Sequence, residues 1–238
     1  MKQFNALFTL ILAVAFAVSP LLTSPFSGFR ADQLPVPQID PPIQPAGYAF
    51  AIWGLIYAWL VISAVYGFLK RRDADDWNRA RIPLMVSLAI GVPWLAIANA
   101  SAIWATITII LMAAFAIWSL ILAPTRDRWL FQAPVAIYAG WLTAATWVSI
   151  GTTMAGYDVL LNAFGWAVVG ITGALIVALA VFRKRSMAPE FLFTVIWALA
   201  GIIISNGVEG LIISTLAAAG ILILLAAMTM WVSDDVRA

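Results

Sequence analysis

The sequence predicts an all-α fold, a polytopic helical bundle that crosses a membrane about eight times. Its 238 residues are 64% hydrophobic and only 10% charged, so polar side chains are too few to cover a soluble domain of this size. Apolar stretches long enough to cross the ~30 Å hydrocarbon layer also follow one another along the chain, with short polar breaks between them.

The expected membrane spans cover residues 5–22, 47–69, 82–100, 102–123, 130–153, 162–182, 190–205 and 211–232. The thirteen Lys and Arg residues test this assignment, because short loops rich in these residues stay in the cytoplasm. With the amino terminus inside, Arg30 is the only one of these basic residues that falls outside the cell. An odd number of spans would distribute the basic residues over both faces of the membrane. We therefore expect a bacterial inner (plasma) membrane protein with both termini in the cytoplasm.

Two interpretations of the first span remain open. The chain begins Met-Lys and continues into an apolar run that ends near Ala15, Phe16 and Ala17, which is also typical of a cleavable signal peptide. We favour a retained helix, because the apolar stretch is longer than the usual ~7 to 15 residues of a signal-peptide core. Either interpretation leaves the next loop outside.

The longest external connection covers residues 23–46 and is rich in proline. Its prolines are Pro25, Pro35, Pro37, Pro41, Pro42 and Pro45. Proline favours extended polyproline conformation and prevents a regular helix, so the loop is expected to be stiff. It is equally compatible with a lid across the mouth of the bundle and with a plain connector.

Two further prolines, Pro93 and Pro134, fall inside the third and fifth spans. Each removes a backbone hydrogen bond, and we expect each to disturb its helix. Such prolines are common in membrane helices, so neither indicates a functional site by itself.

Ordinary catalytic groups are scarce. The chain contains no His and no Cys, which removes disulfides, thiolate chemistry and the commonest haem and zinc ligands. Every carboxylate lies in a loop or near the end of a span, so no acid–base pair and no ion-carrying station is expected within the membrane. We expect no enzyme, no metal site and no covalently bound cofactor, and we assign the basic loops to membrane topology rather than to nucleic-acid binding.

The spans are instead rich in tryptophan, with twelve in the chain. Six lie near span ends, where aromatic belts are usual: Trp59, Trp77, Trp104, Trp129, Trp166 and Trp231. Five are expected to lie deeper, where they either pack between helices or face a cavity in which a flat ligand stacks on them: Trp53, Trp94, Trp141, Trp147 and Trp197.

Helical spacing groups some of these aromatics. Trp53 and Tyr57 are four residues apart, and Tyr138, Trp141 and Ala145 form one stripe on the fifth span, since residues three or four apart share a helix face. Such stripes are more often packing surfaces than ligand pockets.

Two segments resemble the TspO family, the tryptophan-rich sensory or translocator proteins. Residues 45–57, Pro-Ala-Gly-Tyr-Ala-Phe-Ala-Ile-Trp-Gly-Leu-Ile-Tyr, are similar to the second helix of that family. Residues 134–145, Pro-Val-Ala-Ile-Tyr-Ala-Gly-Trp-Leu-Thr-Ala-Ala, are similar to its fifth helix, and Trp94 matches a Trp of the third. Gly91 and the pair Val148 and Ser149 stand where the family usually has Asn, and three more spans follow, so an extended branch is expected.

The resemblance implies a TspO-like five-helix core over residues 1–153, followed by three additional transmembrane helices over residues 154–238. It also implies a pocket closed by the loop after the first helix and lined by Trp53, Tyr57, Trp94, Tyr138, Trp141 and Ala145. The implied ligand is a porphyrin, another tetrapyrrole or a similar lipophilic molecule, and the implied role is a sensory or regulatory receptor or carrier. Some family members are proposed to degrade porphyrin with light, which leaves an enzyme as a weaker alternative.

Two other functions remain open at this level. The eight helices could form a transporter for a neutral solute, or a structural subunit whose aromatic faces bind other components of a membrane complex. Membrane lipid and a hydrophobic small molecule are the expected partners, and a second copy of the chain or another membrane protein is a further one.

Overall fold

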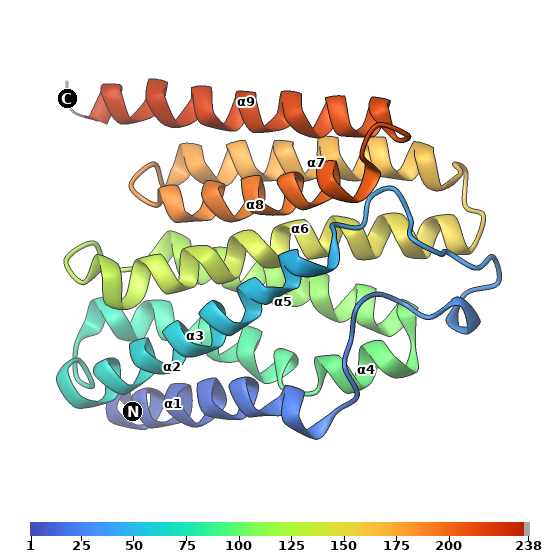
Figure 1. The fold of residues 1–238 in the computed structure, drawn as a ribbon. Helices are drawn as coiled ribbons and strands as arrows, with labels where there is room; N and C mark the ends of the chain where they lie inside the picture. Colours follow the sequence, from blue (N-terminus) through green and yellow to red (C-terminus); the bar gives the residue numbers. More distant parts are fainter. Residues whose placement is uncertain (236–238) are drawn as a thin grey trace.

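The apolar stretches form helices that run back and forth along one axis (Figure 1). This computed structural model describes the backbone of residues 1–235 and the side chains of residues 1–230. The main helices are α1 (Lys2–Val18), α2 (Ile52–Lys70), α3 (Asp75–Gly91), α4 (Trp94–Ala100), α5 (Ala102–Leu122), α6 (Ala133–Gly156), α7 (Ala163–Lys184), α8 (Pro189–Asn206) and α9 (Leu211–Asp235). Short helical turns are η1 (Ser19–Leu22), η2 (Ala31–Gln33), η3 (Gly47–Ala51) and the π-helix η4 (Arg128–Gln132). No strand occurs among the described residues.

Within the described residues, eight helical stretches are long and apolar enough to cross a membrane, which confirms the predicted number of spans. Four of them combine neighbouring elements: α1 with η1, η3 with α2, α3 with α4, and η4 with α6. The chain is therefore a multi-pass α-helical membrane protein. The first span packs into the bundle through Ala6, Ala13 and Phe16.

The third span begins earlier than predicted. Helix α3 starts at Asp75 rather than near residue 82, since Asp75 and Asp76 suit the positive end of a helix even though the first turns are polar. This start places Trp77 inside the bundle, where it is 1% exposed. Trp77 thus lies near the end of its span, as predicted, although its side chain packs between helices. The side chain of Trp231 lies outside the described residues.

The prolines at positions 93 and 134 coincide with helix irregularities, whereas Pro83 lies inside α3. Pro93 separates α3 from α4, with a tight turn in which it serves as the amino-terminal cap residue of α4, so the predicted disturbance is confirmed. Pro134 falls in the first turn of α6, directly after η4, where the Ala133 amide donates to the Arg128 carbonyl five residues earlier. The fifth span thus accommodates its proline next to a π-turn, as helices often do where the regular bonding pattern is interrupted.

The positive residues gather at one end of the bundle. Helix α1 begins and helix α9 ends on the same side (Figure 1), which is also where the connections from α2 to α3, α5 to α6 and α7 to α8 lie. Eleven of the thirteen Lys and Arg residues fall on this side, Arg30 falls on the other, and Arg237 lies outside the described residues. We call the two sides the basic end and the loop end.

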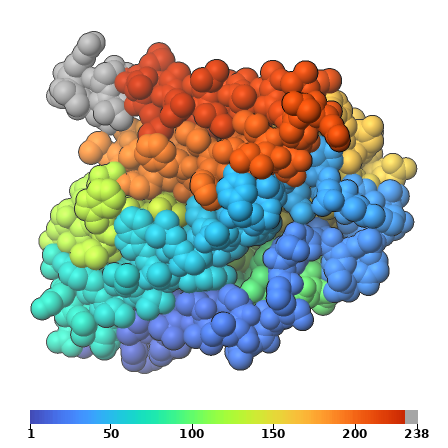
Figure 2. Space-filling view, in the orientation of Figure 1, coloured from blue at the N-terminus to red at the C-terminus, as the bar shows by residue number. Residues whose placement is uncertain are grey.

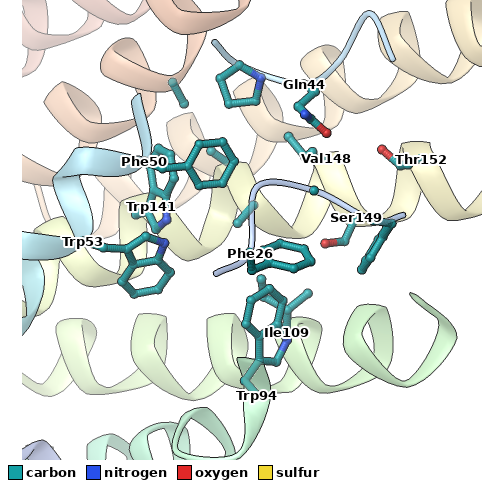
Figure 3. Close-up of a pocket in the computed structure, with 16 residues that line it drawn as sticks. Phe26, Gln44, Phe50, Trp53, Trp94, Ile109, Trp141, Val148, Ser149 and Thr152 are labelled. Atoms are coloured by element: carbon teal, nitrogen blue, oxygen red, sulfur yellow. The ribbon is translucent and has the colours of Figure 1, made fainter. Parts of the chain in front are cut away.

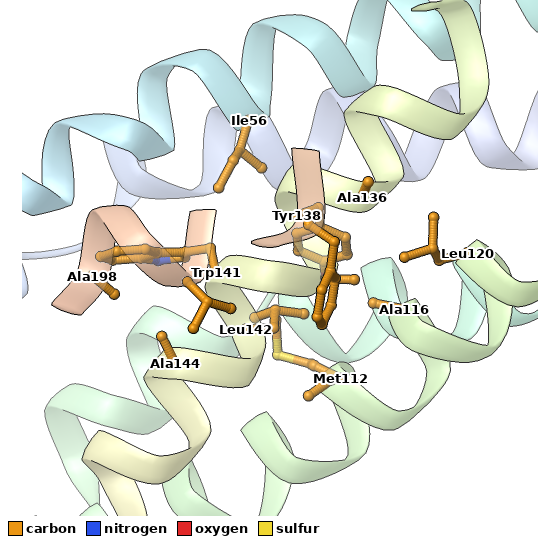
Figure 4. Packing of buried hydrophobic residues seen from close by; sticks show 14 of the residues in the cluster. Ile56, Met112, Ala116, Leu120, Ala136, Tyr138, Trp141, Leu142, Ala144 and Ala198 are labelled. Atoms are coloured by element: carbon orange, nitrogen blue, oxygen red, sulfur yellow. The ribbon is translucent and has the colours of Figure 1, made fainter. Parts of the chain in front are cut away.

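Helix α6 forms the centre of the bundle. Its side chains Tyr138, Trp141 and Leu142 pack among α2, α5 and α8 (Figure 4). Gly140 lets α8 approach closely, since a Cβ atom at this position would lie 2.5 Å from the Phe191 carbonyl oxygen. Helices α7 and α8 therefore pack directly on the core helix instead of forming a separate body.

One partly buried carboxylate joins three segments at the basic end. Asp127 accepts hydrogen bonds from the Arg71 guanidinium and from the Trp77 indole N–H, each at 2.8 Å. The hydrogen bond from Arg71 is the main reason that the pKa of Asp127 lies below its usual value, with the Trp77 bond adding to the effect. This ion pair ties the loop after α2 to the loop before η4.

Candidate ligand pocket

Helix α6 supplies one wall of a cavity that opens towards the loop end of the bundle. The cavity encloses about 570 Å³ of space not filled by atoms, a figure that includes gaps between side chains and space open to solvent. The α6 residues that line it are Trp141, Ala144, Ala145, Val148, Ser149 and Thr152. Trp141 and Thr152 are eleven residues apart, close to three helical turns, so they share a face and lie ~16 Å apart along the axis.

The other walls come from elements far apart in the sequence (Figure 3). The loop after η1 contributes Phe26, Gly28, Phe29, Gln44 and Pro45, while η3, α2, α4, α5 and α8 contribute Phe50, Trp53, Trp94, Ile109 and Ala198. No Asp, Glu, Lys or Arg side chain lines this cavity. It is an apolar, largely aromatic site with a few polar groups, which is the usual character of a site for a lipophilic molecule.

Four of the six residues predicted for the pocket line the cavity, namely Trp53, Trp94, Trp141 and Ala145. The other two, Tyr57 and Tyr138, lie about one helical turn closer to the basic end. There Phe16 of α1 packs against both rings, with centroid distances of 5.0 and 5.7 Å. Neither tyrosine lines the cavity.

The two tyrosines support the wall instead of forming it. Tyr57 stacks on Trp53 with ring centroids 5.2 Å apart. Tyr138 is fully buried, and its hydroxyl lies 2.9 Å from the Ser87 hydroxyl, which itself donates to the Met112 carbonyl oxygen. These contacts fix the side chains behind the cavity and leave Trp53 and Trp141 at its surface.

The aromatic side chains of the cavity meet edge to face. Ring planes are close to perpendicular between Phe50 and Trp141 and between Phe26 and Trp94, at centroid distances of 5.8 and 5.3 Å. This geometry is the favourable one for aromatic pairs. It also leaves ring faces available to a flat molecule.

Two hydrogen-bonding groups in the cavity wall are unsatisfied. The indole N–H of Trp94 donates to the Ala105 carbonyl oxygen at 3.1 Å, but the indole N–H of Trp141 has no partner among the described residues. The hydroxyl of Thr152 has none either, and both residues are 3% exposed. Buried polar groups are nearly always paired, so these two are exceptions on the wall of one cavity.

The proline-rich loop lies across the mouth of the cavity. Gln33 donates to the Ala98 carbonyl oxygen at 2.8 Å, and Arg30 donates to the Asn99 carbonyl oxygen at 2.9 Å. Leu34 and Ile43 are buried, and the Val36 amide donates to the Gly156 carbonyl oxygen at 2.9 Å. The loop therefore has the position of a lid, anchored on α4 and on the end of α6.

Some pocket residues had a sequence signal and some had none. Thr152 falls on the same helix face as Trp141, so helical spacing could have predicted it. Phe50 lies within the segment similar to the second TspO helix, so the resemblance could have predicted it. Phe26 and Phe29 belong to an irregular loop, whose path depends on its hydrogen bonds to α4. No local pattern could have placed them.

Comparison with known proteins gives one result for nearly the whole chain. A family model described as TSPO-like protein matches residues 4–230, from α1 into α9. No curated protein and no solved structure matches the chain. Since the matched region includes α7 and α8 as well as the segments similar to the second and fifth TspO helices, the chain belongs to the TSPO-like protein family.

Proposed function

We propose that this protein is a membrane receptor or carrier that binds a porphyrin, another tetrapyrrole or a similar flat lipophilic molecule in the cavity beside α6. The observation that carries the proposal is the unpaired indole N–H of Trp141 in a cavity with aromatic walls. A flat ligand stacks on the exposed ring faces, and an acceptor on its edge receives the Trp141 proton. Neither interaction needs a metal ligand, which suits a chain without His or Cys.

The lid gives the proposed site an entry route. Phe26 and Phe29 lie over the cavity from the loop side, and Phe26 packs on Trp94. Hence a ligand the size of a tetrapyrrole enters when this part of the loop moves outwards. Closure of the loop then slows the release of the ligand.

A binding role fits the lining residues better than a catalytic one. General acid–base catalysis requires a pair of titratable side chains within reach of the substrate. No such pair lines the cavity. The same composition gives an ion-driven transporter no charged station in the cavity. A neutral-solute transporter and an assembly subunit are the competing functions, and solute flux into proteoliposomes would identify the transporter.

We further propose that the basic end faces the cytoplasm of a bacterial inner membrane. The support is the distribution of Lys and Arg described above, because such residues are retained on the cytoplasmic side. The cavity then opens towards the outside, below the lid.

Binding of protoporphyrin to purified protein in mild detergent tests the proposed function. We expect saturable quenching of tryptophan fluorescence. Replacement of Trp53 by Leu removes a stacking face worth ~0.5 to 1.5 kcal/mol, and should weaken binding from about twofold to more than tenfold. Trp104→Leu is the matched control, because Trp104 is 62% exposed on the outer surface of α5. Equal affinity of wild type and both variants would favour the assembly subunit.

A further inference from the structure

A second hollow lies on the outer surface of the bundle, on the side that faces the membrane. It encloses about 830 Å³, including open space. Its apolar walls include Ile52 and Leu55 of α2, Ile137 of α6, and Phe193 and Trp197 of α8. Figure 2 shows this face of the molecule, with α2 in cyan and α8 in orange. We call this hollow the lateral groove.

The groove exists because α2 and α8 diverge. Near the loop end they are held together through η3, where the Trp197 indole N–H donates to the Ala49 carbonyl oxygen at 3.0 Å and Tyr48 packs edge-on against Trp197. From there α2 runs obliquely across α6 towards the basic end, while α8 continues along the bundle axis (Figure 1). Helix α6 is left as the floor between them.

A carboxylate with an unused acceptor lies at the basic end of the groove. Glu190, in the first turn of α8, lines the groove and is 8% exposed. One carboxylate oxygen pairs with the Arg128 guanidinium, whereas Oε2 has no hydrogen-bond partner among the described residues. The hydroxyl of Thr194, also on the groove, donates instead to the Glu190 carbonyl oxygen.

The partner of this carboxylate is also incompletely satisfied. Arg128 Nε has no acceptor within the described part of the chain, although the guanidinium lies 4.6 Å from the centre of the Trp129 ring. Trp129 in turn stacks against Trp59, whose indole N–H donates to the Trp129 carbonyl oxygen. Paired tryptophans of this kind are typical of the level of lipid headgroups.

We propose that the lateral groove is a specific site for a phospholipid with a primary ammonium headgroup, taken from the membrane leaflet at the basic end. An acyl chain lies along the apolar walls, the ammonium donates to Glu190 Oε2, and the phosphate accepts from Arg128. Charge complementarity selects this headgroup. The Glu190–Arg128 pair is neutral overall, so a zwitterion completes an alternating ring of charges, whereas an anionic lipid adds an uncompensated charge. A choline headgroup has the same charge as ethanolamine but no N–H to donate.

Lipid retention measured by native mass spectrometry tests this site, after reconstitution with equal amounts of phosphatidylethanolamine and phosphatidylcholine of identical acyl chains. We expect ethanolamine lipid to be retained about tenfold over choline lipid, the scale of a hydrogen bond to a charged group. Glu190→Gln should bring the ratio close to one. Glu209→Gln, the same change at an exposed position in the turn between α8 and α9, should leave the ratio unchanged.

A second variant blocks the groove while leaving the Glu190–Arg128 ion pair intact. Ala51 lines the groove and is exposed. Its side chain carries no polar atom that could bond to Glu190 or Arg128. Ala51→Phe therefore fills the groove without disturbing the ion pair. It should lower the retention of both lipids severalfold, while Ala58→Phe on an exposed part of α2 should not. Equal retention of the two lipids by wild type, or a ratio that survives Glu190→Gln, would overturn the proposal. So would occupation of the groove by a second copy of the chain.

Discussion

Trp53 and Trp141 meet edge to face in the wall of the cavity, with ring centroids 6.2 Å apart and ring planes at 83°. Each ring has its own support, Tyr57 behind Trp53 and Phe50 beside Trp141. The pair comes from the two segments that resemble TspO helices, although 88 positions separate the residues, from 53 to 141. The fold therefore joins the two motifs in a single aromatic wall.

The first prediction isolates the indole N–H of Trp141. Trp141→Phe keeps an aromatic ring but removes an unpaired buried donor, whose burial costs ~1 to 3 kcal/mol. The unliganded variant should consequently unfold at a temperature no more than slightly below that of wild type, because loss of the donor offsets loss of ring volume. Its affinity for protoporphyrin should fall by about tenfold.

Trp94→Phe provides the matched control for this experiment. The Trp94 indole N–H is already paired with the Ala105 carbonyl oxygen, so its removal breaks a native hydrogen bond worth ~0.5 to 1.5 kcal/mol. Thermal unfolding should show that Trp94→Phe is the less stable of the two variants. Protoporphyrin titration should show that Trp141→Phe is the weaker binder. If Trp141→Phe binds protoporphyrin as tightly as wild type, the indole N–H of Trp141 does not contact the ligand.

The second prediction concerns the lid. Gln33→Ala breaks the 2.8 Å hydrogen bond that anchors the loop on the Ala98 carbonyl oxygen, and also the 2.8 Å bond that Gln33 Oε1 accepts from the Arg30 amide within the loop. Gln33 does not line the cavity. Dissociation of protoporphyrin, followed by stopped-flow fluorescence, should become about two- to tenfold faster, which corresponds to one neutral hydrogen bond. Association should change less, because the loop must open for entry in either protein.

Gln38→Ala is the control for the lid variant. Gln38 donates only to the Val36 carbonyl oxygen within the same loop, so the substitution shortens the same side chain without releasing an anchor on α4. Dissociation should match that of wild type. If both variants release the ligand at the wild-type rate, the loop acts as a plain connector.

The sequence was informative where a property is local. Eight spans follow from hydropathy alone, and Pro93 marks the break between α3 and α4 because it cannot donate a backbone hydrogen bond. The start of α3 was predicted too late, because its first turns carry Asp75, Asp76 and Arg79. Hydropathy scores such residues as loop, although a helix amino terminus and a buried ion-pair network accommodate them.

Long-range packing limited the prediction of the pocket. Spacing placed Tyr138 on the same stripe as Trp141, but Tyr138 packs against Phe16, from a helix more than a hundred residues earlier, and does not line the cavity. The lid residues Phe26 and Phe29 and the carboxylate of Glu190 were likewise beyond local patterns. Their positions depend on contacts between segments that no periodicity relates.

The third prediction tests the orientation in the membrane. Reporter fusions after Lys70, Arg128 and Arg185 should all read cytoplasmic, because each follows a connection at the basic end. A fusion after Arg30 should read external, since this residue lies at the loop end. A cytoplasmic signal at Arg30 would reverse the proposed orientation and place the lid inside the cell.

The fourth prediction concerns the stability of the basic end. Arg71 and Trp77 both donate to Asp127, and the pKa of Asp127 is lowered in the folded protein chiefly by the Arg71 bond. A carboxyl group with a lowered folded-state pKa stabilises the fold at pH values above its unfolded pKa of ~3.9. This stability is lost as the pH falls through the lowered folded-state pKa. Asp127→Asn should therefore cost roughly 1 to 3 kcal/mol near neutral pH.

The pH dependence distinguishes the charge from the shape of Asp127. Below pH ~4 the difference between wild type and Asp127→Asn should begin to shrink, because the unfolded wild-type chain takes up a proton there, and it should disappear as the pH falls through the lowered folded-state pKa of Asp127. Asp32→Asn is a suitable control, since Asp32 pairs with Arg30 at an exposed position on the lid, and exposed ion pairs contribute little. Thermal unfolding in detergent between pH 3 and pH 7 gives the comparison. A constant difference across this range would mean that Asp127 acts through its shape and hydrogen-bonding pattern, without a contribution from its charge.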